Sequence, residues 1–338
     1  MSEKTNLSKN ITIIDVAAEA NVSKSTVSLV LKGSHLIKGD TAERVKEAAI
    51  KLGYIYNRRA GELRGNSSNA IGVVINDLMN PFFAEVLVGI ERKLVEAGFV
   101  VLIAHTNENL ELQNKLLMSM REQNAAGIML CPAINTPRSI VKTIQSWGIP
   151  LTVFVRNLGP GSYDFAGTNS EEGTYLATCH LLNSGHTRIG FLGGQEGVVY
   201  TERLAGYKRA LNEKGITFSE DIVVKANPNR QGGHEAMFAI LKITPKVNVA
   251  VCYNDIVAYG ALSALGEKGL RAGTDFYLMG FDNLLASAHS NPPLSTVDIQ
   301  PSDLGEHAAA ILLKRIQNPN AKKIVFNTKP FLQLRQTA

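Results

Sequence analysis

Residues 12–33 read TIIDVAAEANVSKSTVSLVLKG, and this stretch predicts two short helices joined by a tight turn. Apolar residues recur at helical spacing after Thr12, which pairs with Asp15 in a weak form of the capping box. Ser23 is a good N-cap for the second helix, and Gly33 ends that helix. Two short helices in this arrangement form a helix-turn-helix, the unit that decides the fold of the N-terminal region.

The residues that follow predict one more helix and then a domain boundary. Residues 40–52 form an amphipathic helix that ends at Gly53 and would cover the first two helices. Residues 57–64 are too short and too interrupted by glycine to form a stable helix alone, so only a partner would order them. The polar residues 65–69 read as a linker, after which the composition changes abruptly.

Beyond the linker, β-branched apolar runs alternate with amphipathic helical stretches. The predicted strands are residues 71–75, 100–104, 127–131, 151–155, 189–192, 222–224, 249–253 and 276–279. This alternation is typical of a parallel sheet with helices on its faces. Three of the intervening helices are expected to end at a glycine, namely Gly98, Gly215 and Gly269. The chain is long enough for two such sheets, with the seam expected near residues 157–164.

The overall composition is that of an ordinary globular protein. The chain has 338 residues, of which 45% are hydrophobic and 19% are charged. No apolar run reaches the roughly 18 residues that a membrane-spanning helix needs. Because the first ten residues contain no apolar stretch typical of a signal peptide, we expect a cytoplasmic protein with no membrane partner.

The net charge of +5 is unevenly distributed along the chain. Residues 1–66 contain 11 Lys and Arg against 7 Asp and Glu, whereas the remaining residues contain 24 against 23. A basic segment ahead of a nearly neutral body indicates a nucleic-acid-binding head, although a surplus of this size also fits a solvated face.

The sequence contains none of the common catalytic or cofactor motifs. G-x-S-x-G, G-x-x-x-x-G-K-[ST] and G-x-G-x-x-G are all absent. His234 begins a zincin-like pattern, but Phe238 replaces the second histidine. The cysteines at 131, 179 and 252 are far apart, so we interpret them as buried apolar residues. We therefore predict no enzyme, no cofactor and no metal site.

Many segments of the chain, in order, resemble the LacI/GalR repressor family. They are residues 12–31, 44–58, 60–63, 71–74, 80–85, 185–194, 203–207, 252–262, 280–283 and 293–297. Within the family, residues 26–31 together with 57–65 resemble the MalI-type repressors of a maltose locus.

The resemblance implies a small all-α helix-turn-helix head followed by an α/β body. The body would consist of two Rossmann-like subdomains of the type I periplasmic-binding-protein kind. The implied boundaries are 1–56 for the head, 57–69 for a hinge helix and linker, 70–160 with 294–319 for the N-terminal subdomain, and 161–293 with 320–338 for the C-terminal subdomain.

The second helix of a helix-turn-helix lies in the major groove of DNA, with its N-terminal residues at the base edges. Lys24 can donate to guanine, Ser25 can donate or accept, and Leu29 offers only an apolar contact. Many family members have Arg at the position of Leu29, so the half-site should shift away from guanine there. Alternatively, Leu29 packs in the core of the head. The predicted DNA-contacting residues of the head are Thr12, Ser23, Lys24, Ser25, Thr26, Ser28 and Leu29.

The resemblance places a further set of DNA contacts in the hinge. Leu63 matches the family's apolar wedge, which enters the minor groove at the centre of the operator. Asn57, Arg58 and Arg64 would contact the backbone, although Arg64 also fits a solvated side chain. The resemblance implies that two copies of the wedge act together at the operator centre. The chain has no leucine-heptad tail after Gln336 of the kind that makes some family members tetramers. We therefore expect a homodimer on a pseudo-palindromic double-stranded operator.

The resemblance also implies an effector cleft between the subdomains, lined by Phe82, Arg203, Asn254 and Asp282. A guanidinium and a carboxylate can together grip the hydroxyls of a sugar, and the guanidinium can bind an acidic group, so a sugar or a sugar phosphate is expected. Asp282 and Asn254 also fit simpler roles, as a helix cap and a turn residue. Several relatives have an aromatic residue near the pair Pro228-Asn229, and its absence leaves sugar binding itself open.

These observations predict a transcriptional regulator that acts as a repressor of carbohydrate genes, and the subfamily resemblance implies maltose genes. A small ligand would close the cleft and change operator affinity by a coupling of about 1–3 kcal/mol. The alternatives are a sugar-binding protein without DNA function, disfavoured by the helix-turn-helix, and an enzyme built on the α/β body, disfavoured by the missing motifs.

Overall fold

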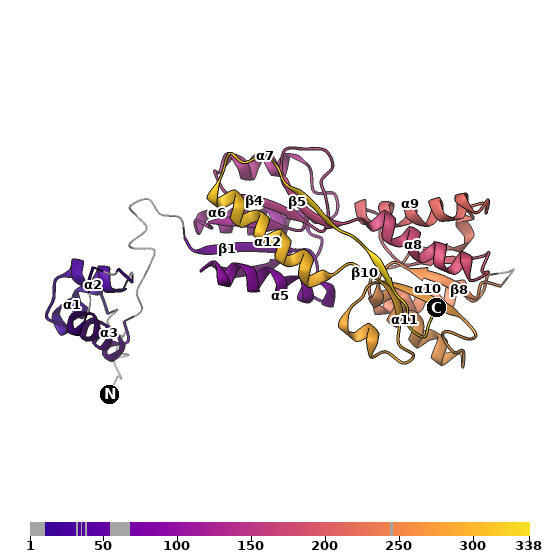
Figure 1. Cartoon of the computed structure of the whole chain (residues 1–338), viewed down its shortest axis with the longest axis horizontal. Coiled ribbons are helices and arrows are strands. Elements are labelled where there is room, and N and C mark those ends of the chain that lie inside the picture. The colour runs from indigo at the N-terminus through magenta and orange to yellow at the C-terminus, as the bar shows by residue number, and fades with distance from the viewer. Residues whose placement is uncertain (1–10, 32, 35, 38, 55–67, 244–245) are drawn as a thin grey trace, which may run out of the picture. The chain divides into compact units, whose positions relative to one another are not determined.

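The computed structural model describes residues 11–54, except 32, 35 and 38, and residues 68–338, except 244 and 245. The chain divides into two compact units, residues 1–68 and residues 69–338 (Figure 1). We call the first unit the head and the second unit the body, and we describe each by itself.

The head contains the three predicted helices. They are α1 (Ile13–Glu19), α2 (Lys24–Leu31) and α3 (Asp40–Leu52). The Thr12 amide donates to Asp15 Oδ2 at 2.7 Å, which confirms the predicted cap at the start of α1. Val16, Val27 and Val45 come from the three different helices and are fully buried against one another in one small core. The helix-turn-helix that residues 12–33 predict is therefore present.

The body contains two six-stranded sheets, each covered by helices on both faces. The first sheet has the order β11-β5-β4-β3-β1-β2 and is parallel throughout. Its strands are β1 (Ala70–Ile75), β2 (Val100–His105), β3 (Gly127–Leu130), β4 (Leu151–Phe154), β5 (Asp164–Thr168) and β11 (Val325–Thr328). Its helices are α5 (Pro81–Glu96), α6 (Leu110–Glu122), α7 (Ser139–Ser146) and α12 (Pro301–Gln317).

The second sheet has the order β12-β10-β9-β8-β6-β7, and only β12 runs antiparallel to its neighbour. Its strands are β6 (Gly190–Leu192), β7 (Val223–Val224), β8 (Val249–Cys252), β9 (Tyr277–Asp282), β10 (Ser295–Asp298) and β12 (Phe331–Gln333). Its helices are α8 (Ser170–Asn183), α9 (Val198–Glu213), α10 (Arg230–Ile240) and α11 (Asp255–Glu267), with short 3-10 turns at η1 (Glu220–Ile222) and η2 (Leu285–Ala288).

The pairing of the strands moves all three crossovers away from the predicted boundaries. β5 pairs with β4, so the first sheet extends to residue 168 instead of stopping at 160. β10 pairs with β9, so the second sheet keeps residues 294–298, which were expected in the first. β11 returns to the first sheet beside β5 before the chain crosses to β12 (Figure 1). The first subdomain therefore comprises residues 69–168 and 300–328, and the second comprises 170–298 and 331–338.

Helix α12 comes late in the sequence but packs closely against α5 in the first subdomain (Figure 1). A Cβ at Gly89 would overlap the carbonyl of Ser302, and a Cβ at Gly305 would overlap the carbonyl of Val86. Glycine is therefore required on both helices for this close approach of their backbones. This contact packs the two separate sequence segments of the first subdomain against each other.

Several smaller predictions are also tested by the body. Gly98, Gly215 and Gly269 all follow their helices with positive φ, as predicted. Cys131 and Cys252 are buried, whereas Cys179 is only partly buried, because it lies on the half-exposed side of α8. Among the described residues, none of the helices is both long and apolar enough to cross a bilayer.

Candidate functional site

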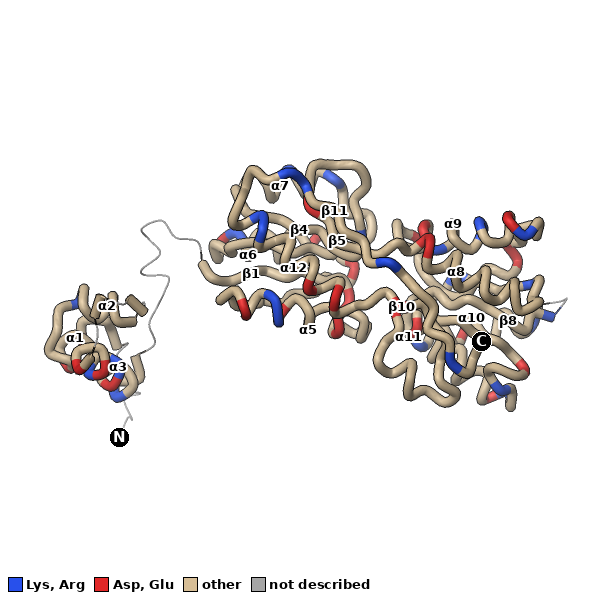
Figure 2. Tube along the Cα trace, viewed as in Figure 1, with Lys and Arg blue, Asp and Glu red and all other residues tan. Residues whose placement is uncertain are grey.

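The N-terminal end of α2 carries the polar residues predicted to read DNA. Lys24 and Ser25 are exposed in its first turn, and the helix contains no acidic residue (Figure 2). Leu29 is half-buried and is not among the residues that form the described hydrophobic core of the head. The structure therefore does not support the alternative in which Leu29 packs in that core. A helix N-terminus with an adjacent lysine attracts the negative charge of DNA phosphates.

Three of the other predicted contacts already have structural partners at the helix ends. Ser23 Oγ accepts from the Thr26 amide at 3.2 Å, and its hydroxyl also lies 2.8 Å from that of Ser25. The Thr12 hydroxyl donates to Asp15 Oδ2 at 2.6 Å. Ser23 is therefore the N-cap that the sequence predicts, and Thr12, Ser23 and Thr26 shape the ends of the helices.

Of the remaining residues predicted to contact DNA, one lies within the described part of the head and four do not. Ser28 is half-buried within α2. The predicted hinge contacts Asn57, Arg58, Leu63 and Arg64 lie outside the described residues.

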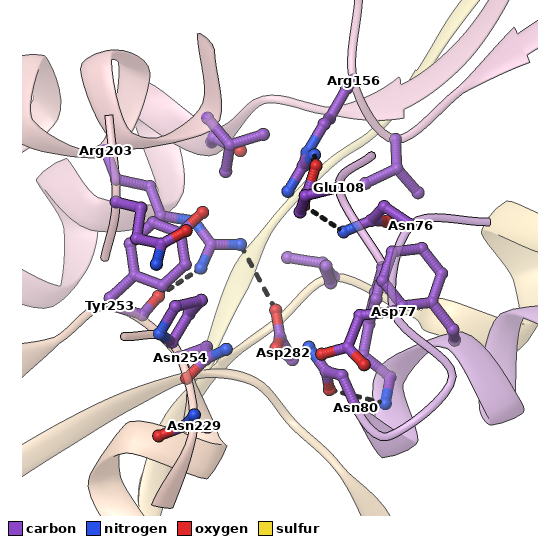
Figure 3. A pocket seen from close by; sticks show the side chains of 18 of the residues that line it. Asn76, Asp77, Asn80, Glu108, Arg156, Arg203, Asn229, Tyr253, Asn254 and Asp282 are labelled. Carbon is purple, nitrogen blue, oxygen red and sulfur yellow. Dashed lines mark hydrogen bonds and ion pairs between the residues drawn. The ribbon is translucent and has the colours of Figure 1, made fainter. Parts of the chain in front are cut away.

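In the body, a cavity of about 390 Å³ lies between the two subdomains (Figure 3). Its polar lining comes mainly from residues at the carboxyl ends of the strands of both sheets or in the loops after them. These residues are Asn76, Asp77, Asn107, Glu108, Arg156, Thr168, Gln195, Asn227, Asn229, Asn254 and Asp282. The carboxyl ends of parallel strands meet at one edge of a sheet, which is where α/β proteins bind ligands. All four predicted effector residues, Phe82, Arg203, Asn254 and Asp282, line this cavity.

Arg203 and Asp282 form a buried ion pair on the second-subdomain side of the cavity. The Arg203 Nη2 atom lies 3.3 Å from Asp282 Oδ1, and Nη1 donates to the carbonyl of Tyr253 (Figure 3). The guanidinium carbon lies 3.6 Å from the centre of the Phe281 ring and 4.7 Å from that of Tyr253. Arg203 is therefore fixed by charge, hydrogen bonding and stacking together.

Asp282, at the end of β9, has both a raised pKa and a rare backbone conformation. Burial raises the pKa of its carboxyl to about 8, although the neighbouring Arg203 guanidinium opposes this rise. Its φ of 119° lies in a region that non-glycine residues rarely adopt. Strained backbone and perturbed pKa values both cluster at functional sites, so they mark Asp282 as a candidate ligand-binding group.

The sequence analysis also considered simple structural roles for Asn254 and Asp282, and the structure shows one for Asn254 only. Asn254 is the N-cap of α11, because its side-chain oxygen accepts from the Val257 amide at 2.9 Å. Asp282 does not cap the turn that follows it. Instead the buried carboxylate of Asp255 accepts from the Leu284 amide at 2.9 Å. Asn254 is thus both a cap and a cavity residue, while Asp282 is free of a capping role.

The first-subdomain side of the cavity contains an ion pair that the sequence analysis missed. Arg156 Nη1 lies 2.8 Å from the Glu108 carboxylate, which also accepts from Asn76 Nδ2 at 2.8 Å (Figure 3). The second Glu108 oxygen accepts from the Ile134 amide at 2.8 Å. The Cys131 thiol donates to Asn76 Oδ1 at 3.2 Å. The position of these residues just after predicted strands was the signal that could have identified them.

Pro228 and Asn229 also line the cavity, where some relatives were expected to have an aromatic residue. Asn229 is the N-cap of α10, accepting from the Gly232 amide at 2.8 Å. No aromatic side chain therefore enters the cavity from these two positions.

Comparison with known families agrees with both units. Residues 12–57 match the model described as bacterial regulatory proteins, lacI family. Residues 68–331 match the model described as periplasmic binding proteins and sugar binding domain of LacI family. The chain belongs to the LacI family. The predicted fold class, a helix-turn-helix head with a two-subdomain α/β body, is confirmed.

Individual LacI-family relatives match along nearly the whole chain. The HTH-type transcriptional repressor PurR of Aliivibrio salmonicida is 32% identical over 96% of this chain and 98% of its own length. The protein of the same name from Pasteurella multocida is also 32% identical, with the same coverage of both chains.

Solved LacI-family structures share the fold. The lac repressor dimer bound to operator and the anti-inducer ONPF gives a TM-score of 0.85 at 25% identity, covering 97% of this chain and 99% of that one. The transcriptional regulator CelR–cellobiose complex gives a TM-score of 0.74 at 26% identity, covering 97% and 100%. The chain is therefore a DNA-binding transcriptional regulator with an effector-binding body, and not an enzyme, as predicted. These comparisons do not support the finer resemblance to MalI-type repressors.

Proposed function

We propose that this chain is a homodimeric repressor whose operator affinity is set by a neutral sugar bound between the two subdomains. The observation that carries the proposal is the polar cavity, in which each of two guanidinium groups is already paired with a carboxylate. Paired groups of this kind can donate to and accept from the adjacent hydroxyls of a sugar at the same time.

The charge of the cavity favours a neutral ligand over a phosphorylated one. Its lining contains two arginines, Arg156 and Arg203, and three acidic residues, Asp77, Glu108 and Asp282. Arg156 is ion-paired with Glu108 and Arg203 contacts the Asp282 carboxyl, so a phosphate would have to displace a carboxyl group to reach either guanidinium. A sugar phosphate is therefore the less favoured form of a carbohydrate ligand.

The alternative ligand is a purine, which the name PurR of the relatives suggests. A planar base is commonly held by stacking on an open aromatic face. The rings of Tyr253 and Phe281 are covered by the Arg203 guanidinium, and Phe82 is only 5% exposed. Carboxamides and hydroxyls dominate the rest of the lining, so the cavity matches a polyol better than a base. The CelR structure holds cellobiose, a neutral sugar, in a protein of the same family.

The homodimer is supported by an uncovered apolar surface in the first subdomain. β2 is an edge strand on which Val100, Leu102 and Ile103 are exposed, and the adjacent α5 exposes Val88 and Val95. An unpaired apolar edge of this kind is normally covered by a partner. A dimer presents two copies of the head, in which Lys24, Ser25 and Leu29 would read each half-site of a pseudo-palindromic operator. By resemblance, Leu63 would mark its centre.

Titration calorimetry with the full-length protein tests the ligand class. The ligands are maltose, cellobiose, ribose, glucose 6-phosphate and hypoxanthine, with maltose representing the locus that the subfamily resemblance suggests. We expect a neutral sugar to bind and to change operator affinity in a gel-shift assay at a fixed salt concentration. Binding of hypoxanthine alone would contradict the proposal.

The DNA-binding role is tested by selecting bound sequences from a random duplex pool. We expect a palindrome, with no guanine preference at the step read by Leu29. Leu29→Arg should introduce that preference with a discrimination of about 1–3 kcal/mol, because arginine bonds guanine through two atoms. Recovery of no common sequence from the unaltered protein would contradict the assignment of α2 as the reading helix.

A further inference from the structure

A second cavity, of about 510 Å³, lies where the chain crosses between the two subdomains. Its lining includes residues 168–171 at the first crossover and Asn327 just before the third. We call it the crossover cavity. None of the four predicted effector residues lines it, so it is a site separate from the effector cavity. Its volume falls within the range of about 300–1,000 Å³ that small-ligand sites occupy.

Hydrogen bonds hold the walls of the crossover cavity in place. The Tyr163 hydroxyl donates to the carbonyl of Gly159 at 2.7 Å, which fixes the loop of residues 157–163. The Lys323 ammonium donates to the carbonyl of Gly161 at 3.1 Å, which connects the start of β11 to the same loop. A ligand that enters a cavity with fixed walls loses less affinity to ordering of the protein.

The lining contains one acidic and one basic group that lack an ion-pair partner. They are Glu202 and Lys323, and neither is in an ion pair with any residue in the described part of the chain. Glu202 Oε1 accepts from Asn157 Nδ2 at 3.0 Å, and burial raises the pKa of the Glu202 carboxyl. Glu171, the other acidic residue of the lining, is already paired with Arg209 at 2.8 Å. A half-buried carboxylate without a cation is unfavourable, so Glu202 would be stabilised by a ligand cation.

The rest of the lining combines an unpaired hydroxyl with an apolar surface. Thr168 lies in the wall that the crossover cavity shares with the effector cavity, and its buried Oγ1 has no hydrogen-bond partner among the described residues. Buried polar atoms in folded proteins are almost always hydrogen-bonded. Phe165 and Val325 are register partners on β5 and β11, and both line the cavity. A ligand would therefore meet an apolar surface as well as both charges.

We propose that the crossover cavity is a second regulatory site that binds a small apolar zwitterion, of the class of free amino acids and short peptides. The ammonium group of the ligand pairs with Glu202, its carboxylate pairs with Lys323, and its side chain lies against Phe165 and Val325. A zwitterion satisfies both charges at once. A neutral ligand would leave both without a partner, and a phosphate would be repelled by Glu202.

A ligand in this position would bridge the two subdomains. Lys323 belongs to the first subdomain and Glu202 to the second. The hydrogen bond between Asn157 and Glu202 already crosses the same boundary at 3.0 Å. A ligand held from both sides favours one arrangement of the subdomains over others, and it can therefore change operator affinity separately from the effector.

Titration calorimetry on the full-length protein, without added sugar and at pH 7, tests the ligand class. The zwitterions are leucine, phenylalanine and leucylleucine, and the last tests a wider spacing of the two charges. N-acetylleucine lacks the ammonium group, and leucinamide lacks the carboxylate. We expect at least one zwitterion to bind, and each derivative of leucine or leucylleucine that lacks a charge to bind at least about tenfold more weakly than its parent.

Two variants assign each charge of the ligand to one side chain. Glu202→Gln should weaken the zwitterion and leucinamide about tenfold but leave N-acetylleucine unchanged. Lys323→Gln should weaken the zwitterion and N-acetylleucine but leave leucinamide unchanged. The matched controls are Glu213→Gln, at the far end of the same helix α9, and Lys322→Gln, which is exposed beside Lys323 and outside the cavity. Neither control should change any of these affinities.

The remaining outcomes decide against parts of the proposal. If no zwitterion binds, or if the derivatives that lack a charge bind as tightly as their parents, the ligand class is wrong. If Arg203→Met abolishes zwitterion binding while Glu202→Gln does not, the ligand occupies the effector cavity and the crossover site is wrong. If a zwitterion binds but a gel shift with the selected operator shows no change in affinity, the regulatory role is wrong.

Discussion

The two sides of the effector cleft differ in how firmly their polar groups are held. On the second-subdomain side, Arg203, Asn254 and Asp282 are 6%, 3% and 3% exposed, and each bonds another group of its own subdomain. On the first-subdomain side, the side chains of Arg156 and Glu108 are 15% and 29% exposed. The ion pair of the second side is therefore buried and fixed, whereas that of the first side is partly hydrated, although the second side also presents the exposed residues Gln195, Asn227 and Asn229 to the cavity.

This difference suggests a division of roles. A buried charge cannot change partners without leaving an unsatisfied group, so the fixed side is suited to a feature that every effector shares. A partly hydrated ion pair can rearrange at a lower free energy, so the other side is suited to telling related ligands apart.

Removing Arg203 should have the largest effect. Arg203→Met retains the stem but removes a buried cation and its charge-assisted hydrogen bonds, each of which contributes about 1.5–3 kcal/mol. Effector affinity should therefore fall at least about 100-fold, since each factor of ten corresponds to about 1.4 kcal/mol. Titration calorimetry measures this loss.

A matched control for that variant lies on the same helix. Arg209 pairs with Glu171 and Glu172 outside the cavity, so Arg209→Met should leave affinity unchanged. The Arg203→Met protein should still fold at neutral pH, because loss of the guanidinium, which opposes the rise in the pKa of Asp282, favours the uncharged carboxyl. Equal losses in the two variants would contradict the special role of the fixed side.

Changing Glu108 should have a smaller effect that depends on the ligand. Glu108→Gln keeps the shape but leaves Arg156 without its charge partner, and we expect affinity to fall about tenfold with an altered ranking of saccharides. Glu111→Gln, on the exposed face of α6, is the control. An equal loss for every ligand would contradict a discriminating role for this side.

The pH dependence of binding tests the state of Asp282. Burial raises its pKa to about 8 against the effect of Arg203, so the ionised fraction of the carboxyl, and with it the ion pair with Arg203, should increase from pH 7 to pH 9. If a ligand hydroxyl donates to the carboxylate, affinity should rise roughly tenfold from pH 7 to pH 9, in step with the ionised fraction of the carboxyl. Asp282→Asn should flatten this profile, and Asp303→Asn on the surface should not.

The same shift predicts the sign of a stability effect. The folded protein holds the Asp282 proton more tightly than the unfolded chain, so this group's contribution to stability is complete at low pH. It declines as the pH rises from about 4 towards 8. Thermal unfolding of the unaltered protein and of Asp282→Asn across this range measures the difference.

The smallest expected effect is at Asn80, on the partly hydrated side. Its side chain caps α5 by accepting from the Phe82 amide at 3.0 Å, so Asn80→Ala should cost about 1 kcal/mol of stability. Effector affinity should change about twofold. Asn109 caps α6 outside the cavity, so Asn109→Ala should cost similar stability with no change in affinity. A tenfold loss in Asn80→Ala alone would place Asn80 among the essential ligand contacts.

The sequence predicted the elements of the fold better than their connections. The eight apolar runs all contain strands. Most of them have the continuous apolar sequences of buried parallel strands, and β2 is the exposed edge strand of its sheet. Four strands were missed. β5 reads DFAGT and follows a stretch rich in glycine and proline, and the short strands β10, β11 and β12 near the C-terminus were not predicted either. The crossovers depend on which strands pair, and pairing between residues far apart in the sequence leaves no local signal.

Only some of the residues that line the cleft were predicted, again because contacts between distant residues leave no local signal in the sequence. Arg203 and Asp282 were identified because their segments resemble those of a known family. Glu108 and Arg156 were not, since each is an isolated charged residue after a strand, and only the fold brings them to 2.8 Å.

The close packing of α12 on α5 has a consequence for biosynthesis. All the strands of the first sheet except β11 leave the ribosome before α8 is made, but α12 and β11 emerge only near the end of translation. At roughly 5–20 residues per second, the apolar face of α5 then waits many seconds for the helix that covers it. The first subdomain should therefore complete its folding only after most of the second has been synthesised.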